Sequence, residues 1–351
     1  MKQALLGLNT EELGRLAVQE GEPAYRRKQL AEWIYRRYAH AFEEMTDLPV
    51  SFRSRLVSKY LVGRAETVVE RRSRDGTVKL LLEMADGARV ETVGLPYEDR
   101  LSCCVSTQVG CAVGCLFCAT GLSGYVRNLT AGEIVAQVLA VEETVRNGHS
   151  QQGLVPDRSN ERIDHVTFMG MGEPLLNYEA TLKALSLLNV EKGIAARNLT
   201  VSTSGFVPGI LKLAREKLQI TLAISLHAAS DELRRRLVPG MAKWSIFEIL
   251  AAVGEYFKQT GRRITFEYCL LNGENDSIEE AQKLAGLLRG LNCHVNLIPY
   301  NQVAELGLQA SPEKRVRAFR GVLEAAGIQV TQRQERGADI EAACGQLRRR
   351  T

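Results

Sequence analysis

Residues 104–121 read CVSTQVGCAVGCLFCATG and hold four of the chain's eight cysteines. Cys111, Cys115 and Cys118 follow the spacing Cys-x3-Cys-x2-Cys, and the glycines around them permit a tight loop. Thiolates this close in sequence can converge on one metal centre, and the pattern favours a [4Fe-4S] cluster with three cysteine ligands and one open iron. A zinc ion usually takes four Cys or His ligands, and no histidine lies nearby in the sequence. Zinc and three unrelated buried cysteines remain as alternatives.

From about residue 100 onward, short apolar segments alternate with helical runs, which predicts parallel βαβ units. Six units are too few for a closed eight-stranded barrel, so an open partial barrel or a doubly wound sheet remains. The predicted strands are 101–105, 165–169, 199–203, 221–226, 264–271 and 294–298. The predicted helices are 131–146, 177–189, 207–217, 245–259 and 276–290, and a helix at 312–326 leads into a further strand at 328–333.

Glycine-rich, cysteine-rich or polar loops follow the predicted strands. In both fold classes, functional loops gather at the carboxyl ends of the strands. The loops are the cysteine stretch, GMGEP (170–174), SG (204–205), HAAS (227–230), NGEND (272–276) and PYN (299–301). We therefore expect the chemistry of the protein at one rim of the sheet.

The first 95 residues follow a different pattern. Residues 1–62 read as helical, with a helix start at 9–12. Residues 65–95 read as three strands joined by Asp-Gly turns at 75–76 and 86–87. We predict three parts: an accessory domain of helices and a small antiparallel meander at 1–95, an α/β core at 96–335 and a C-terminal segment at 336–351.

The composition of the chain excludes several classes of protein. The chain has 351 residues, 45% hydrophobic and 25% charged, with a formal net charge of +4. Disordered chains, collagens and coiled coils have other compositions, and no stretch approaches the ~18 apolar residues of a membrane span. The N-terminus carries no signal-peptide pattern, so we expect a cytoplasmic protein. Clustered cysteines in that reducing compartment indicate metal binding or catalysis rather than a disulfide scaffold.

The cysteine motif after the first strand of an α/β barrel resembles the signature of the radical S-adenosylmethionine (SAM) enzymes, and Phe117 matches their apolar or aromatic residue before the last cysteine. The resemblance implies a partial (β/α)6 barrel and a [4Fe-4S] cluster that binds SAM and cleaves it to a 5′-deoxyadenosyl radical. The GMGEP stretch resembles the family's glycine-rich segment that meets the methionine amino group. The same resemblance implies these SAM contacts: Gly172, Glu173, Ser204, Ser225, Leu226, His227 and Asn301.

Longer motifs make the resemblance more specific, and they span about residues 22–347. In order they resemble the RlmN-type ribosomal RNA adenine-C2 methyltransferases. The motifs are the cysteine stretch, NLTAGEI (128–134), MGMGEPLLN (169–177), SLHA (225–228), NLIPYN (296–301) and DIEAACGQL (339–347). The resemblance implies methylation at C2 of an adenosine in the peptidyl transferase region of 23S ribosomal RNA and of the adenosine 3′ of the anticodon in some tRNAs. Because C2 is not nucleophilic, the family uses two SAM molecules per turnover.

The same resemblance implies roles for three further residues. Cys344 matches the cysteine that takes a methyl group from the first SAM, and the second SAM then converts this S-methyl group into a radical that adds to C2. Cys104 matches the resolving cysteine, which forms a disulfide with Cys344 and releases the methylated base. Glu91 matches the acceptor of the C2 proton. We expect the remaining three cysteines to be packing residues: Cys103, Cys269 and Cys293.

Three rival functions share parts of the pattern. The related C8 adenine methyltransferase of the Cfr type shares the cysteines, but residues 174–176 and 203–205 resemble the C2 type. A radical SAM enzyme of another reaction class has no need for Cys344. A non-enzymatic iron–sulfur protein that binds RNA would not cleave SAM.

RNA binding requires Lys and Arg side chains to neutralise phosphates. Basic runs on helices are also commonly solvated faces, so both interpretations of these residues stay open. The implied electron donor is a flavodoxin or ferredoxin, and nothing in the sequence demands a dimer, so we expect a monomer. The candidate RNA contacts are Arg26, Arg27, Lys28, Arg36, Arg37, Arg348, Arg349 and Arg350.

Overall fold

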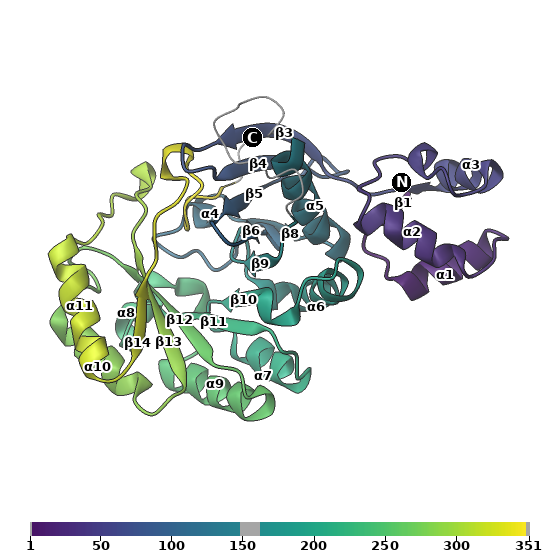
Figure 1. Cartoon of the computed structure of the whole chain (residues 1–351). Helices are drawn as coiled ribbons and strands as arrows, with labels where there is room; N and C mark the ends of the chain where they lie inside the picture. Colours follow the sequence, from purple (N-terminus) through teal and green to yellow (C-terminus); the bar gives the residue numbers. More distant parts are fainter. Residues whose placement is uncertain (1, 148–161, 349–351) are drawn as a thin grey trace.

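The computed structural model describes residues 2–147 and 162–348, and a ten-stranded sheet forms its centre (Figure 1). Seven strands are parallel: β6 (Leu101–Cys104), β9 (His165–Phe168), β10 (Leu199–Thr203), β11 (Thr221–Ser225), β12 (Ile264–Leu270), β13 (Cys293–Pro299) and β14 (Gln329–Gln332). They lie in chain order across the sheet. Each of them confirms a strand predicted from the sequence.

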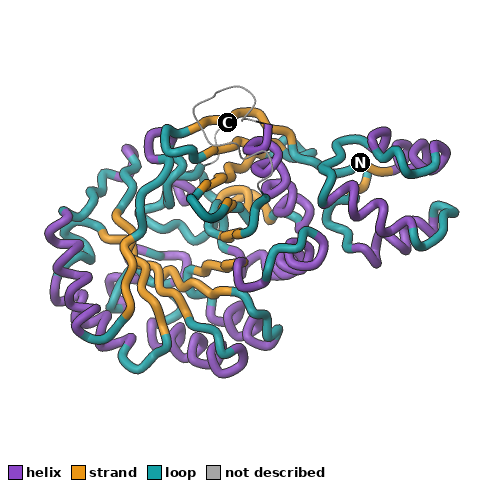
Figure 2. Tube along the Cα trace, in the orientation of Figure 1, coloured by secondary structure: helices purple, strands orange, loops and turns teal. Residues whose placement is uncertain are grey.

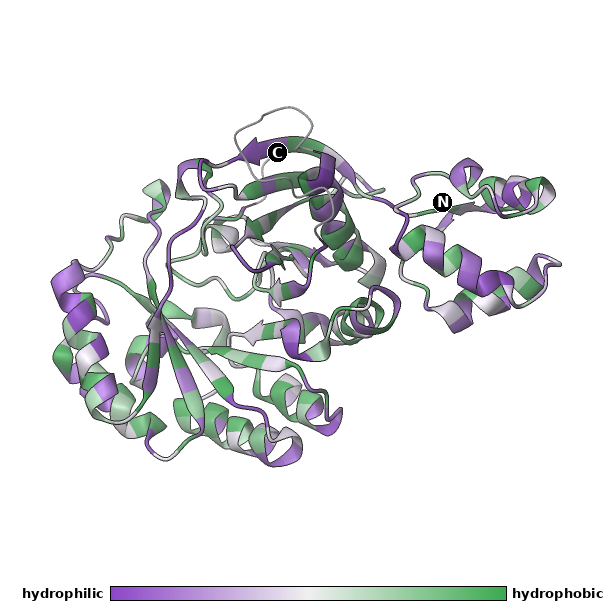
Figure 3. Ribbon diagram, viewed as in Figure 1, coloured by the Kyte–Doolittle hydropathy of each residue, from purple (hydrophilic) through white to green (hydrophobic). Residues whose placement is uncertain are grey.

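Helices between the parallel strands cover the outer face of the curved sheet (Figures 1 and 2). They are α5 (Ala131–Asn147), α6 (Tyr178–Ser186), α7 (Val207–Arg215), α9 (Ile246–Thr260), α10 (Ile278–Leu288) and α11 (Glu313–Ala325). Figure 3 shows hydrophobic residues concentrated along the strands and the helices packed on them. Within the described residues, no helix has the length and apolar character that crossing a membrane requires.

One helix of the barrel, α8 (Asp231–Leu237), was not predicted. Its sequence, DELRRRL, spans only seven residues, and its only buried residues are Arg234 and Leu237, so it shows no apolar stripe. Ser230 begins the helix, because its side chain accepts a hydrogen bond from the Leu233 amide. The helix lies beside the candidate site described below.

Three antiparallel strands extend the same sheet beyond β6: β5 (Arg89–Pro96), β4 (Val78–Glu83) and β3 (Glu66–Arg72). They are the predicted meander. Strand β5 pairs with β6, with Val93 opposite Cys104. An unpaired strand edge leaves backbone N–H and C=O groups without partners, and β5 satisfies those of β6. The meander therefore belongs to the barrel sheet, and the predicted division of the chain at residue 95 stays a prediction.

Residues 2–62 form a separate helical lobe (Figure 1). Its helices are α1 (Thr10–Gln19), α2 (Arg26–Tyr35) and α3 (Val50–Lys59), and β1 (Gln3–Ala4) pairs with β2 (Tyr60–Leu61). The predicted helix start is confirmed, because Asn9 and Glu12 form a capping box in which each side chain accepts the other's backbone N–H.

Buried polar groups join this lobe to the barrel. The Lys192 ammonium lies 2.9 Å from both the Glu142 carboxylate and the Tyr38 hydroxyl. Tyr38 donates to Glu142, and the Ile163 amide also donates to it. Burial lowers the pKa of Lys192, and Glu142 opposes that shift. A buried charge is tolerated only when it is paired, so this contact fixes the lobe on α5.

We predict that Lys192→Met lowers the free energy of unfolding by ~3 kcal/mol, because it leaves the Glu142 carboxylate buried without its cation. Urea unfolding at pH 7 measures this loss. The double variant Lys192→Met/Glu142→Gln should recover most of it, and the exposed control Lys258→Met should cost under ~1 kcal/mol. Equal losses in the single and double variants would contradict the assignment.

Candidate active site

The three clustered cysteines lie in a loop that leaves β7 (Gln108–Gly110), passes through the short helix α4 (Ala119–Leu122) and returns as β8 (Tyr125–Asn128). The hairpin of β7 and β8 was not predicted. Gly110 has φ +80°, and a Cβ there would lie 1.7 Å from the Gly124 carbonyl oxygen, so no other residue fits. The Cys111 amide donates to the same carbonyl at 3.0 Å and closes the loop.

Cys111, Cys115 and Cys118 line one cavity of about 150 Å³, here called the cluster cavity. Burial raises the pKa of Cys111 to about 11 and that of Cys115 well above its ordinary value. Among the described residues, no three Cys, His, Asp or Glu side chains lie close enough together to hold a single metal ion. The three cysteines share one cavity, and a donor set of three cysteines is the one that a [4Fe-4S] cluster with one open iron uses.

The rim loops supply further polar groups to the cluster cavity. Glu173 accepts hydrogen bonds from the Leu175 amide at 3.1 Å and the Ser204 amide at 2.6 Å, and burial raises its pKa. Gly172 has φ +104°, and a Cβ there would lie 2.6 Å from that of Gln108. Gly172, Glu173 and Ser204 all line the cluster cavity, so the GMGEP loop lies directly beside the cysteines.

His227 also lines the cluster cavity, although the sequence shows no histidine near the cysteines. It packs edge-on against Phe117, with ring centroids 4.7 Å apart. Its Nδ1 accepts the Cys269 amide at 3.0 Å, and burial together with the charge of Arg234 lowers its pKa to about 3. His227 is therefore a neutral side chain at neutral pH.

The remaining implied SAM contacts occupy different positions. Ser225 lines the cluster cavity, and its hydroxyl lies 3.2 Å from that of Ser202. Leu226 has a fully buried side chain that does not line the cavity. Asn301 lines a second, adjoining cavity and donates to the Cys344 carbonyl at 2.9 Å.

Cys104 and Cys344 meet in this second cavity, which has a volume of about 60 Å³ and is also lined by Cys118. Burial and, to a smaller extent, the nearby Cys344 thiol raise the pKa of Cys104 to about 11, and Arg333 opposes the shift. All eight cysteines are free in the structure. The Cys104–Cys344 disulfide implied by the resemblance is thus not present in it.

The other three cysteines are buried, as expected. Cys103 is fully buried near the Thr92 hydroxyl, while its neighbour Cys104 lines the second cavity, as alternation along a strand requires. Cys293 is buried at the start of β13. Cys269 was expected to be a packing residue, and it also lines the cluster cavity.

The C-terminal segment that carries Cys344 is fastened to the site. The Ala119 amide donates to the Gly345 carbonyl at 2.7 Å, and Thr120 donates to the Leu347 carbonyl at 2.5 Å. Gly345 has φ +85°, a conformation that favours glycine. These contacts hold residues 344–347 against the cysteine loop.

Glu91 is buried beneath the same segment. One carboxylate oxygen lies 3.2 Å from the Lys79 ammonium, and the other accepts the Arg348 amide at 2.9 Å. Lys79 also donates to the Glu341 carbonyl at 2.9 Å. The carboxylate implied as proton acceptor is thus tied to the segment that carries Cys344.

Sequence reasoning missed three charged residues of the site: Lys79, Arg234 and Arg333. Arg333 lines both cavities, and the facing Cys344 thiol is the main reason that its pKa is raised. Its position at the end of a predicted strand, on the functional rim, was the available signal. Lys79 and Arg234 gave no local signal, because they contact backbone carbonyls, which every residue provides, and, for Lys79, a carboxylate on the neighbouring strand.

The basic residues of the N-terminal lobe are mostly paired within the lobe. Arg26 lies 3.6 Å from Glu22 and Arg27 lies 3.0 Å from Glu11, while Arg36 and Arg37 both lie within 4 Å of Glu32. Arg348 pairs with Glu305. The candidate contacts Arg349 and Arg350 lie outside the described residues. These ion pairs reduce the net positive charge available to RNA, so this surface stays a proposal.

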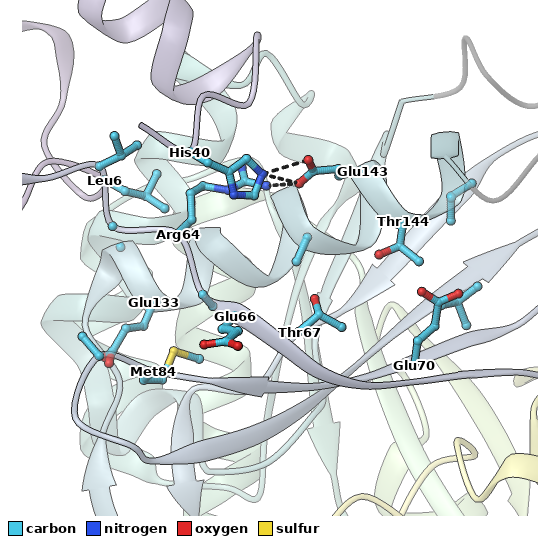
Figure 4. Close-up of a pocket in the computed structure, with 18 of the residues that line it drawn as sticks. Leu6, His40, Arg64, Glu66, Thr67, Glu70, Met84, Glu133, Glu143 and Thr144 are labelled. Carbon is cyan, nitrogen blue, oxygen red and sulfur yellow. Dashed lines mark hydrogen bonds and ion pairs between the residues drawn. The ribbon is translucent and has the colours of Figure 1, made fainter. Parts of the chain in front are cut away.

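A larger cavity, of about 1040 Å³, lies between the helical lobe, β3 and α5 (Figure 4). None of the clustered cysteines lines it. Three of its charged or titratable groups pair with one another: Glu143 accepts from both His40, at 2.8 Å, and Arg64. We find no chemistry in this space comparable to that of the two cysteine-lined cavities.

A partial α/β barrel with three cysteines in the loop after its first strand defines a radical SAM enzyme. Residues 105–285 match the family described as the radical SAM superfamily, and residues 3–62 match the ribosomal RNA large subunit methyltransferase N-terminal domain. The chain belongs to the RlmN family of dual-specificity RNA methyltransferases. The predicted family and fold class, an α/β radical SAM barrel with an N-terminal accessory domain, are confirmed.

Three relatives carry this assignment. The dual-specificity RNA methyltransferases RlmN of Thermosynechococcus vestitus and Lysinibacillus sphaericus are 46% and 43% identical to this chain, covering 98% and 99% of it and 98% and 89% of their own lengths. The crystal structure of a radical SAM methyltransferase from Sphaerobacter thermophilus has a TM-score of 0.92 and 46% identity, covering 98% of this chain and 99% of its own. Membership of the superfamily implies a [4Fe-4S] cluster and SAM as cofactors.

Proposed function

We propose that this methyltransferase acts at C2 of adenosine, in the peptidyl transferase region of 23S ribosomal RNA and 3′ of the anticodon in some tRNAs. The observation that carries the proposal is that Cys104, Cys344 and Cys118 line one small cavity, which adjoins the cluster cavity. A reaction that passes a carbon through one cysteine and releases it with another needs two further thiols at such a place. The relatives' name, dual-specificity RNA methyltransferase, supports RNA of two kinds as substrate.

We assign the cluster to Cys111, Cys115 and Cys118, and SAM to the rim loops around Glu173. When bound, the cluster and SAM supply a methyl group for Cys344 and then, from a second SAM, the radical that activates that S-methyl group. The assignment is supported by Glu173, which offers an acceptor for an ammonium group and lines the cluster cavity together with Gly170 and Gly172.

Cys344 takes the methyl group through its sulfur, which requires the thiolate form. Arg333 supplies a cation that faces this thiol. The hydrogen bonds from Asn301 to the Cys344 carbonyl and from Ala119 to the Gly345 carbonyl hold the backbone in place. Cys344 can therefore present its sulfur to the SAM side and the RNA side without a large movement of the chain.

Cys104 completes the cycle. After the methylene carbon has joined C2, the adduct radical would return one electron to the oxidised cluster and pass the C2 proton to Glu91. The Cys104 thiolate would then attack the Cys344 sulfur. The S–C bond breaks and its electron pair goes to the methylene carbon, which takes up a proton to become the methyl group, so the methylated base leaves and a Cys104–Cys344 disulfide remains. Two external electrons and two protons then return both thiols, which requires a reducing compartment such as the cytoplasm. A flavodoxin or ferredoxin is the proposed donor for the cluster, and a monomer is the proposed assembly.

We predict that Cys104→Ala stops the reaction at the covalent stage, because no thiol then releases the base from Cys344. An enzyme–RNA adduct should accumulate, and the methylated product should fall by at least ~10²-fold. A denaturing gel with a labelled RNA fragment measures both. Cys103→Ala, the neighbouring residue that lies outside the cavity, is the matched control and should give no adduct.

The adduct should vanish in the double variant Cys104→Ala/Cys344→Ala, because Cys344 is the proposed point of attachment. An adduct that persists in the double variant would contradict the assignment of Cys344. Unchanged product formation by Cys104→Ala alone would contradict the assignment of Cys104.

A further inference from the structure

Arg234, on α8, is the largest fully buried side chain among the described residues. Its guanidinium donates to the Ser225 carbonyl at 3.1 Å, to the Leu226 carbonyl at 2.6 Å and to the Ser204 carbonyl. These carbonyls belong to the rim loops after β10 and β11. One planar group thus ties together two loops whose serines line the cluster cavity.

Among residues 2–147 and 162–348, Arg234 forms no direct ion pair with a carboxylate, although the charges of Asp231 and Glu173 raise its pKa, and its buried Nε has no hydrogen-bond partner. Its neighbour Asp231 accepts the Ile246 amide at 2.7 Å. The cysteine loop lies against the end of the same helix, because the Leu116 amide donates to the Leu237 carbonyl at 3.0 Å, and the Cys115 thiol opposes the lowering of the Arg234 pKa that burial causes. A buried cation is costly unless an anion faces it.

The surrounding residues leave room for this side chain. Gly205 has φ +93°, and a Cβ there would lie 2.8 Å from an Arg234 nitrogen and 2.6 Å from Ile249. Any larger residue at 205 would displace the guanidinium from the Ser204 carbonyl. The glycine at position 205 therefore leaves the space that the Arg234 side chain occupies beneath the rim loops.

We propose that Arg234 is a positioning residue that serves as the internal counter-charge of the cysteine cluster and fixes the SAM-facing rim loops. The inference rests on the proposed cluster at Cys115. Three thiolates give a bound [4Fe-4S] cluster a negative net charge, and reduction adds another electron. A buried cation beside it favours the reduced form and so raises its reduction potential.

The experiment uses the reconstituted holoenzyme of the wild type, Arg234→Gln, Arg234→Lys and the matched control Arg235→Gln. Arg235 is the next residue on α8 and is exposed. EPR-monitored redox titration gives the midpoint potential, and equilibrium dialysis gives the SAM affinity. Iron content and circular dichroism establish loading and folding.

We expect Arg234→Gln to lower the midpoint potential, because the charge is lost. Arg234→Lys should keep the potential near that of the wild type but weaken SAM binding about tenfold, because an ammonium cannot hold three carbonyls in the same geometry. Arg235→Gln should change neither quantity. If Arg234→Gln does not load iron, retained potential with weakened SAM binding in Arg234→Lys still supports the proposal.

The proposal would be overturned if Arg234→Gln kept the midpoint potential of the wild type, or if Arg234→Lys kept the SAM affinity of the wild type. Failure of the proposed function has a different signature. Wild-type enzyme that loads a cluster and binds SAM, yet leaves C2 of adenosine unmethylated, contradicts the function and leaves the role of Arg234 standing.

Discussion

Cys344→Ala should lower the rate of RNA methylation by at least ~10³-fold, while the enzyme still binds its cluster and cleaves SAM when reduced. The reason is that Cys344 is the proposed carrier of the transferred carbon, whereas the cluster ligands are other cysteines. Chromatography of reduced reactions measures 5′-deoxyadenosine, and nucleoside mass spectrometry measures the RNA product. Loss of the product with retention of SAM cleavage is the expected result.

Cys293→Ala is the control for this experiment, because Cys293 is buried at the opposite end of its strand from the PYN loop and lines neither cavity. It should retain both activities. Mass spectrometry of the purified wild-type protein should also find a methyl group on Cys344. Product formation by Cys344→Ala at the wild-type rate would show that the carbon takes another route.

The second large effect is expected for Cys118→Ala, which removes one of the three proposed cluster ligands. Iron content and the visible absorption of the cluster should fall to near background after anaerobic reconstitution, and SAM cleavage should be lost with them. Cys118 is the most informative of the three because it lines both cavities.

Cys269→Ala is the matched control, because Cys269 lines the same cavity but lies outside the Cys-x3-Cys-x2-Cys motif. It should load iron like the wild type. The ligand assignment would be refuted if Cys118→Ala kept its iron while Cys269→Ala lost it.

The seven parallel strands were predictable because most of them are short apolar runs bounded by turn residues. Helix α8 was not, because its buried residues are an arginine and a leucine rather than an apolar stripe. The hairpin of β7 and β8 was also missed, since its strands have three and four residues and its closure depends on Gly110 meeting Gly124. Such close contacts between backbones leave little trace in local sequence patterns.

The residues of the candidate site also divide into those that the sequence could predict and those that it could not. The cysteine spacing is local, so the meeting of Cys111, Cys115 and Cys118 at one cavity could be predicted, and the position of the rim loops followed from strand order. Lys79 and Arg234 act through contacts with residues far away in the sequence or through carbonyl groups that any residue provides. From the sequence alone, Arg234 on the charged helix α8 cannot be distinguished from a solvent-exposed arginine.

One measurement tests the central claim most directly. Anaerobic reconstitution with 23S ribosomal RNA and tRNA fragments and with SAM labelled with ¹³C in its methyl group, followed by nucleoside analysis, reports the position of the new methyl group. We predict labelled 2-methyladenosine, formed only when the cluster is reduced and Cys344 is present. Labelled 8-methyladenosine, or no labelled adenosine from an enzyme that cleaves SAM, would contradict the account.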